Sequence, residues 1–300
     1  MKKSNFSSLL ILFLFFCFFW TDNHPVSAQN SAPTTPLRIC FMPCSDELKT
    51  YRKAQPLSSY LETALHRKII IQVPHNYDEF FRIIRKGGTD FAFQSPHLFL
   101  QLEDHYKTDD LLTSLSVSGK KTCTALLVAR ADSDINNIED LKGKTVLFGP
   151  EYSTVKTLAG KNLLKKHGIN LETDLKDYRH GDNCKQIALN VYLKTADAGF
   201  ICSEKYYARL RDNQQSAGEK DSWPFPANAL KIIGQTGEEL TLIISAMKSV
   251  DQTLLSQVKK ALLALNENQH KTILEMMESG GFVDVQPTDL LTLRKQFNQQ

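Results

Sequence analysis

The chain has 300 residues, of which 42% are apolar and 23% are charged. Its formal net charge is only +3, and this near balance argues against a nucleic-acid partner, for which clustered basic residues are expected. The length suffices for one large core or for two lobes.

Residues 1–28 have the parts of a secretory signal peptide. Lys2 and Lys3 precede an apolar run over residues 9–20, and Val26-Ser-Ala28 forms a small-residue cleavage site. The apolar run is shorter than a membrane-spanning helix requires. We therefore expect the signal peptide to be cleaved and the protein to be exported in soluble form.

Strand and helix patterns alternate along the first half of the chain. The residues predict strands over 37–42, 68–73 and 89–93, and helices over 46–65, 77–86 and from about 95 onward. Ser45 or Asp46 is the expected cap of the first helix, and Gly87-Gly88 ends the second.

The same alternation continues in the second half. Strands are predicted over 121–129, 144–148, 197–201, 230–234 and 240–245, and helices over 153–167, 184–194, 253–265 and 272–278. Residues 209–228 are polar and rich in helix breakers, so we expect a surface loop there. The alternation predicts α/β lobes with parallel sheets, whose ligands bind beyond the carboxyl ends of the strands.

The segment from Phe148 to Gly160 is typical of a strand end, a turn and a helix start. Ser153 is the expected N-cap, and Lys156 stands where a capping box would have Glu or Gln. Backbone N–H groups at a helix start lack intrahelical partners and attract anions, so the segment fits a small oxyanion. Most Ser-Thr pairs at helix starts serve only as caps, and these residues alone leave both roles open.

Five cysteines follow the signal peptide: Cys40, Cys44, Cys123, Cys184 and Cys202. An odd number leaves at least one thiol unpaired even where disulfides form. The CxxxC spacing of the first two is weak as a zinc signature. The sequence contains no HExxH, GxSxG, GxxxxGK[ST] or GxGxxG motif, and we expect no metal, no cofactor and no enzymatic activity.

Several segments resemble the periplasmic solute-binding proteins for phosphonate, phosphite and phosphate. The similar segments, in matching order and spacing, are 37–43, 55–62, 88–96, Asp140 to Phe148 with the following Ser153-Thr154, and 194–199. The resemblance covers nearly all of the chain after the signal peptide.

This resemblance implies a two-lobed periplasmic binding protein of type II-like fold. Each lobe would be a mostly parallel sheet flanked by helices, and the lobes would close over an oxyanion by a hinge motion. Residues 29–122 with 235–300 would form lobe 1, and residues 123–234 would form lobe 2. The two hinge crossings would lie near 123–130 and 230–241.

The family pattern is only partly kept in the segment from Phe148 to Gly160, which would hold the anion. Ser153 and Thr154 match its Ser-Thr-Ser motif, but Val155 takes the place of the third hydroxyl. Cys184 stands where the family has a ligand-facing His, and Phe99 stands where an aromatic hydroxyl is usual. The expected ligand contacts are Ser153, Thr154, Val155, Lys156, Tyr152, Cys184, Cys44, Ser95, Cys202 and His180.

The cysteines admit more than one role. Cys44, Cys184 and Cys202 fall at strand ends or helix starts facing the expected cleft, and Cys123 falls at a hinge crossing. They are either small buried residues, members of disulfides, or ligands for a soft species such as Cu(I) or arsenite. The helix start is expected to lower the pKa of the Cys184 thiol.

The resemblance implies a monomeric, exported protein that captures a small oxyanion of the phosphate, phosphite or phosphonate class. Its partner would be an ABC transporter permease or a sensor kinase. Some proteins resembling this family bind arsenite for sensor kinases, so a cysteine-based, arsenite-binding or other thiophile-binding sensory protein is the alternative. A remoter alternative is an enzyme with Cys184 as nucleophile and His180 as base.

Overall fold

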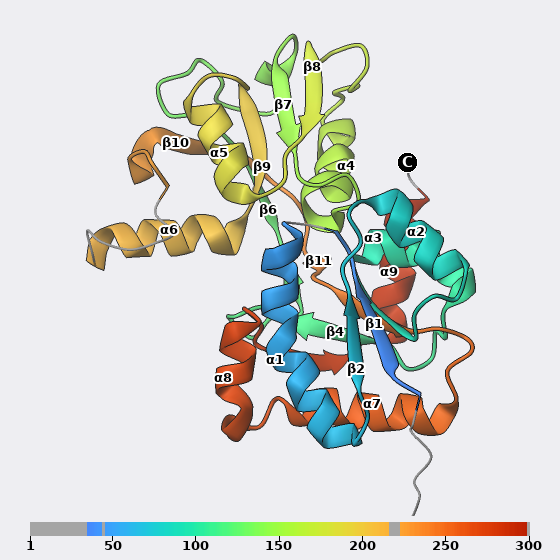
Figure 1. Cartoon of the computed structure of the whole chain (residues 1–300). Helices are drawn as coiled ribbons and strands as arrows, with labels where there is room; N and C mark the ends of the chain where they lie inside the picture. The colour runs from blue at the N-terminus through green and yellow to red at the C-terminus, as the bar shows by residue number, and fades with distance from the viewer. Residues whose placement is uncertain (1–34, 44–45, 216–222, 299–300) are drawn as a thin grey trace, which may run out of the picture. The chain divides into compact units, whose positions relative to one another are not determined.

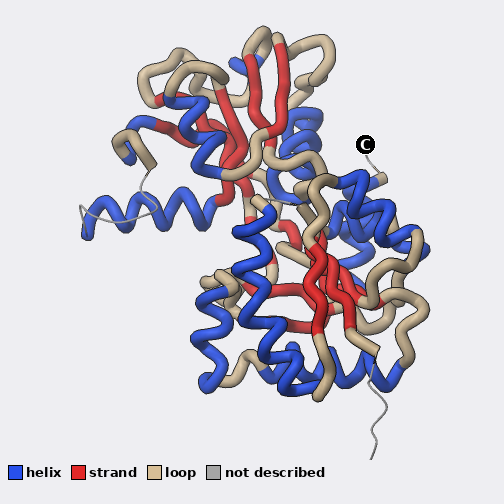
Figure 2. Tube along the Cα trace, in the orientation of Figure 1, coloured by secondary structure: helices blue, strands red, loops and turns tan. Residues whose placement is uncertain are grey.

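The computed structural model describes residues 35–43, 46–215 and 223–298. The predicted signal peptide, Cys44 and Ser45 lie outside the described residues. Residues 35–300 form one compact unit that contains two large sheets with helices packed on them (Figures 1 and 2). Within the described residues, no helix is long and apolar enough to cross a membrane.

The first sheet has the strand order β13-β4-β12-β3-β1-β2. Its strands are β1 (Leu37–Phe41), β2 (Ile69–Gln72), β3 (Phe91–Gln94), β4 (Leu112–Leu115), β12 (Ile243–Ala246) and β13 (Gly281–Asp284). Strands β2, β1 and β3 are parallel, as expected for strands joined by helices, whereas β12, β4 and β13 pair antiparallel. The sheet is therefore mixed. Its parallel part is β2, β1 and β3, and its antiparallel part is formed where β12, β4 and β13 join it.

The helices of this part are α1 (Glu47–Leu65), α2 (Tyr77–Arg85), α3 (Pro96–Gln101), α7 (Gln252–Ala264), α8 (Lys271–Met276) and α9 (Pro287–Phe297). Asp46 caps α1 through the N–H of Lys49, and Gly87 follows α2 with φ of 64°. Helix α1 packs against α7 and α8, and α3 packs against α9. Their apolar side chains and those of the strands form one continuous core.

The second sheet has the order β10-β6-β9-β7-β8. Its strands are β6 (Ala125–Arg130), β7 (Thr145–Phe148), β8 (Asp177–His180), β9 (Ala198–Cys202) and β10 (Leu230–Gln235). Strands β9, β7 and β8 are parallel, whereas β6 and β10 pair antiparallel. The sheet is buried on both faces at β6, since Leu127 and Leu126 of this strand belong to different core clusters, whereas β8 at the edge is largely exposed.

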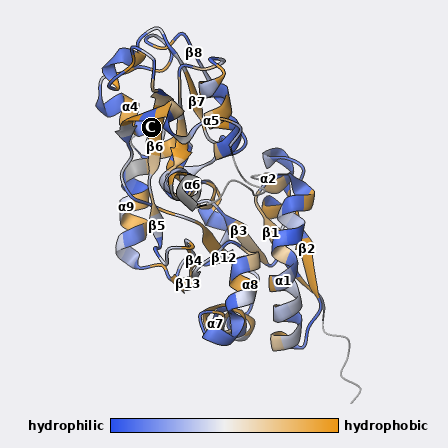
Figure 3. Ribbon diagram, turned by 90° about the vertical axis from the view of Figure 1, so that its left-hand side faces the viewer, coloured by the Kyte–Doolittle hydropathy of each residue, from blue (hydrophilic) through white to orange (hydrophobic). Residues whose placement is uncertain are grey.

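Helix α4 (Ala159–Lys166) contributes to one of these clusters, and α5 (Cys184–Tyr192) and α6 (Ser203–Gln215) contribute to the other. Figure 3 shows apolar colour on β6 in the middle of this sheet, whereas much of α5 is polar. Helix α6 and the buried Trp223 and Phe225 correct the sequence-based expectation of a surface loop over 209–228. The Phe225 ring stacks on Tyr192 at 4.6 Å, a long-range contact that local polarity does not reveal.

Two short strands lie where the chain passes between the sheets. Strand β5 (Thr122–Cys123) pairs antiparallel with β11 (Glu239–Leu240), between β4 and β6 in one direction and between β10 and β12 in the other. The predicted single strand over 121–129 is interrupted at Thr124, whose carbonyl accepts a hydrogen bond from Ser203 N at 3.0 Å. The exact lobe boundaries drawn from the sequence remain a prediction.

Candidate functional site

The segment after β7 turns into a helix at Ser153. Ser153 Oγ accepts a hydrogen bond from Lys156 N at 3.2 Å, as expected of an N-cap. The first turn, Thr154–Leu158, is a π-helix, in which Leu158 N bonds to Ser153 O at 3.0 Å, and only then does α4 begin. The prediction of a regular helix from 153 is thus wrong in its first turn. Single π-turns occur frequently at functional sites, and we call residues 149–158 the ligand loop.

Four backbone N–H groups, those of residues 153–156, are expected to meet an anion. Two of them form hydrogen bonds within the loop. Ser153 N donates to Pro150 O at 2.8 Å, and Lys156 N donates to the Ser153 hydroxyl. The N–H groups of Thr154 and Val155 have no hydrogen-bond partner in the part of the chain that the structure describes. The loop therefore presents two amides, not four.

Lys156 is buried although it is charged, with 9% of its surface exposed. Its stem lies on Gly149, where an added Cβ would be only 2.6 Å from Lys156 Cβ and 2.7 Å from its Cε. Its ammonium nitrogen lies 3.9 Å from Cys184 Sγ. A buried lysine at this place puts a basic side chain directly beside the thiol of Cys184.

Cys184 is the first residue of α5, which Asn183 caps through Gln186 N. Its Sγ accepts a hydrogen bond from Cys202 N, at the end of β9, at 3.2 Å. Interactions with the side chains of Cys123, on the crossing strand β5, and of Cys184 also shift the pKa of the Cys202 thiol. We call Cys123, Cys184 and Cys202 the thiol cluster; all three are unpaired.

The pKa of Cys184 is shifted in the direction opposite to the expected one: it is raised, not lowered. Hydrogen bonding with Cys202 and burial raise this pKa well above its usual value, although the Lys156 ammonium acts in the opposite sense. The pKa of Cys202 is also raised, first by Cys123. The helix start is outweighed because a neighbouring thiol and the loss of water both disfavour the thiolate.

Two hydrogen bonds join the start of α3 to the ligand loop. Ser95 Oγ donates to Tyr152 O at 2.6 Å while it also caps Leu98 N, and His97 N donates to Thr154 Oγ1 at 2.9 Å. The Thr154 side chain is therefore already engaged and buried. Ser95 and Thr154 hold the two sheets' loops together in this structure.

Two of the expected contacts point their side chains elsewhere. The Tyr152 ring packs against the rings of Tyr77 at 4.6 Å and Phe81 at 5.3 Å, within the first core. The Val155 side chain belongs to the second core. Only the backbone groups of Tyr152 and Val155 are thus placed to act at the loop.

His180 and Cys184 do not form the pair required by the enzyme alternative. His180 Nδ1 bonds to Gly149 O at 2.8 Å, so it supports the ligand loop from β8. No hydrogen bond joins the two side chains among the contacts of the described residues. Cys44, another expected contact, lies outside the described residues.

His97 lies next to the ligand loop, although it is not among the ligand contacts expected from the sequence. Burial, followed by the Lys161 charge, lowers the pKa of His97 to about 4. Gln101 Nε2 lies 3.2 Å from its Nε2, and its buried Nδ1 has no partner within the described residues. One feature of the sequence points to His97, namely its position directly after the Ser95-Pro96 helix start.

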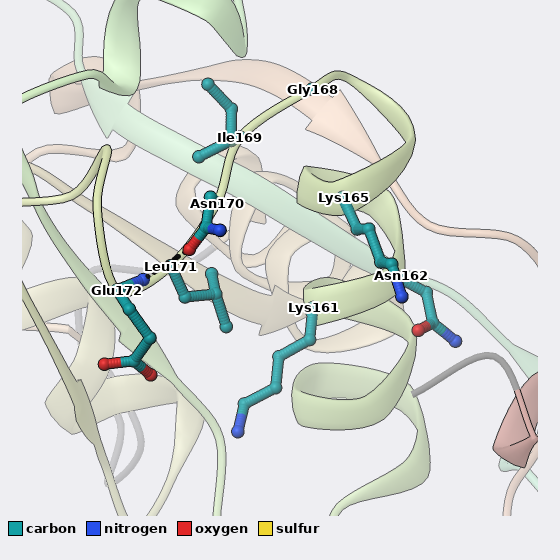
Figure 4. Close-up of a pocket in the computed structure, with 8 residues that line it drawn as sticks. All are labelled: Lys161, Asn162, Lys165, Gly168, Ile169, Asn170, Leu171 and Glu172. Atoms are coloured by element: carbon teal, nitrogen blue, oxygen red, sulfur yellow. Dashed lines mark hydrogen bonds between the residues drawn. The ribbon is translucent and has the colours of Figure 1, made fainter.

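A separate surface pocket lies beside α4 and the loop that follows it (Figure 4). Its lining residues are Lys161, Asn162, Lys165, Gly168, Ile169, Asn170, Leu171 and Glu172. None of the expected ligand contacts lines this pocket. Across the described residues, no group of three or more His, Cys, Asp and Glu side chains is arranged to hold a metal ion.

Comparison with known proteins identifies relatives of this architecture. The family model described as "ABC transporter, phosphonate, periplasmic substrate-binding protein" matches residues 39–290. A Xanthomonas citri protein bound to ATP is similar with a TM-score of 0.72 and 17% identity, over 88% of this chain and 97% of that one. PhnD1 of Prochlorococcus marinus, in complex with methylphosphonate, is similar with a TM-score of 0.70 and 16% identity, over 88% and 97%.

Another similar structure is the binding protein component of an ABC phosphonate transporter from Pseudomonas aeruginosa. Its TM-score is 0.71 at 16% identity, over 87% of this chain and 85% of that one. At these identities the likeness concerns the fold, a mixed α/β two-lobed architecture. The family model, in contrast, is matched along most of the sequence.

Proposed function

The chain belongs to the family of periplasmic substrate-binding proteins of phosphonate ABC transporters, and on this premise we propose that it captures a small phosphorus oxyanion. The family consists of transport proteins that bind substrates, not of enzymes. The proposed ligand is a phosphate, phosphite or phosphonate, held between the ligand loop and the start of α5. The proposed partner is an ABC permease, with a sensor kinase as the alternative.

The observation that carries this proposal is the pair of backbone N–H groups that the ligand loop offers next to the buried Lys156 side chain. The amides of Thr154 and Val155 and the positive end of the helix favour a negative charge. Lys156 adds a full charge where the loop lacks a third hydroxyl. A charge-assisted hydrogen bond from the Lys156 ammonium would thereby replace the hydrogen bond that the missing hydroxyl would have donated.

Calorimetry with phosphate, phosphite, methylphosphonate, sulfate and arsenite, with and without reductant, tests the ligand class. We expect one phosphorus oxyanion to bind most tightly and independently of reductant. Replacing Ser153 and Thr154 together by Ala should abolish this binding. Ser153→Ala alone separates the ligand contact from the Thr154 bond to His97 N, which the double variant also removes.

Lys156→Met is the sharper variant because Met keeps a long apolar stem over Gly149 and removes only the charge. A hydrogen bond to a charged group contributes about 1.5–3 kcal/mol, so the affinity for the oxyanion should fall by roughly 10- to 100-fold. Lys165→Met, a change of the same kind in α4, should leave affinity unchanged. Equal oxyanion affinity of the wild type and Lys156→Met would contradict the proposed role of Lys156.

The thiol cluster favours arsenite as a second candidate ligand. Arsenite is neutral as As(OH)3, and replacement of its As–O bonds by As–S bonds releases water and needs no free negative charge. Protonated thiols with raised pKa beside a lysine fit such a neutral species better than they fit a metal cation. If arsenite in reductant does not change the melting temperature while a phosphorus oxyanion does, this candidate fails.

Export to the periplasm, and removal of residues 1–28 by signal peptidase, are part of the proposal. The N-terminal sequence of the protein recovered from the periplasmic fraction tests both. We expect it to begin at Gln29. We also propose that the protein acts as a monomer without nucleic-acid binding, which sedimentation of the purified protein would test.

A further inference from the structure

The thiol cluster joins three elements that converge near the ligand loop. Cys123 comes from the crossing strand β5, Cys184 from the start of α5 and Cys202 from the end of β9. Cys202 is the central member, because its N–H donates to Cys184 Sγ at 3.2 Å and because the side chains of Cys123 and Cys184 are the two largest influences on its pKa. Ala125, two residues after Cys123, pairs directly with Cys202 across β6 and β9.

We propose that this cluster is a thiol–disulfide exchange site. Cys184 and Cys202 become joined to each other by a disulfide bond, and a small-molecule disulfide such as oxidised glutathione is the oxidant. Cys123 is the second thiol within reach of Cys202, so it can take over the bond from Cys184. The proposal concerns the protein's own sulfur atoms and does not depend on which ligand the loop binds.

The exchange balances in two steps. The Cys202 thiolate attacks one sulfur of oxidised glutathione, whose S–S bond breaks, and the released glutathione thiolate takes up the proton that Cys202 lost. The Cys184 thiolate then attacks the Cys202 sulfur of the mixed disulfide and releases the second glutathione. Two protein thiols are oxidised to one disulfide, and one oxidised glutathione is reduced to two thiols.

The surroundings set the rate and the consequence of this exchange. Only the thiolate attacks, and the raised pKa of both thiols makes the reaction slow at neutral pH and faster by about tenfold per pH unit above it. The disulfide would tie the start of α5 to the end of β9. It would also remove from Lys156 the thiol that lies 3.9 Å from its ammonium, which changes the charge environment of the ligand loop.

Peptide mapping of the native, fully reduced protein tests the site. After incubation with oxidised glutathione at mildly alkaline pH and alkylation of the remaining thiols, we expect a Cys184–Cys202 linked peptide as the main product. Cys40 is an internal control, since burial raises its pKa to about 12 and it should remain reduced. A Cys44→Ser background removes the cysteine whose surroundings the structure does not describe.

Three variants assign the roles within the cluster. Cys123→Ser should still form the Cys184–Cys202 disulfide, Cys184→Ser should shift the product to Cys123–Cys202, and Cys202→Ser should form neither. Glutathione adducts without a linked peptide in the wild type, or a disulfide made mainly with another partner, would overturn the proposal. Because the wild-type result needs no variant and no ligand, it stands apart from any failure of oxyanion binding.

Discussion

His97 is buried beside the ligand loop and Lys156 is buried within it, yet the two side chains differ in protonation. The pKa of His97 is lowered to about 4, so this imidazole is neutral at physiological pH. Lys156 lies instead beside a thiol and on the loop that offers free amides. Only one of the two buried bases is therefore placed to carry a charge to an anionic ligand.

The pH dependence of stability follows from His97. The ordinary pKa of 6.5 applies to the unfolded chain and about 4 to the folded protein, so the folded state prefers the neutral ring. This stability is fully present above pH 6.5 and is lost as the pH falls from 6.5 to 4, by about 3 kcal/mol in all. Urea unfolding at several pH values between 6.5 and 4 measures this loss of unfolding free energy, with the His97→Gln protein as control.

The His97→Gln protein should be less dependent on pH than the wild type between pH 6.5 and 4. Other histidines still titrate in the variant, and His75, which has a raised pKa beside Glu47, acts in the opposite direction. The difference between the two proteins therefore isolates His97. Parallel stability curves would mean that His97 is not buried as neutral imidazole.

At the scale of elements, α5 depends on a close approach to β9. Gly199 has no side chain, and an added Cβ would lie 2.5 Å from Ile187 Cγ2 and 3.3 Å from Val191 Cγ2. The helix therefore sits directly on the strand, which brings Cys184 at its start against Cys202 at the strand end. The glycine in the Ala-Asp-Ala-Gly sequence is thus explained by packing.

Gly199→Ala should destabilise the protein by about 1–3 kcal/mol, because α5 must move to accommodate the methyl group. Gly237→Ala is the matched control, since the nearest atom to its added Cβ is Glu239 Oε1 at 4.0 Å. Denaturant unfolding of the two variants measures the difference. Equal stabilities would show that α5 can adjust without cost, and would weaken the argument that its position is fixed.

On the scale of the whole molecule, contacts between the two sheets' elements hold the present arrangement. Ser95 and His97 donate to the ligand loop, and Glu278 beyond α8 pairs with Lys205 of α6 at 3.4 Å. The pair is partly exposed and contributes little. The buried hydrogen bonds are the stronger determinants, and ligand binding shifts the balance further only by its own differential contacts.

Removal of the Ser95 bond to Tyr152 O should shift the unliganded protein toward a more open form. Ser95→Ala also removes the α3 cap, so Ser95→Asp is needed, because it keeps a capping acceptor and cannot donate to a carbonyl. Both variants should show a larger radius of gyration in small-angle scattering without ligand. Ser59→Ala, at an exposed site on α1, should not. If the Ser95→Asp protein had the wild-type radius of gyration, the effect of Ser95→Ala would come from the lost α3 cap and not from the lost bond to Tyr152 O.

Local sequence was enough to predict most of the strands and helices, the capped helix start at Ser153 and the family to which the chain belongs, but not β4, β8, β13, α6 or α9. These features rest on local periodicity, capping residues and glycine positions, which neighbouring residues encode. The π-turn, the neutral His97 and the engaged Thr154 hydroxyl were decided by tertiary structure. Each depends on a partner far along the chain.

The cysteines show the limit most clearly. Their positions at strand ends and helix starts were visible in the sequence, and so was the possibility of a sulfur site. The direction of the Cys184 pKa was not, because it depends on Cys202 and on burial, and not on the helix start alone. Only the packing of α5 on β9, which Gly199 permits, brings Cys184 against Cys202 and makes the Cys184 thiol hard to ionise.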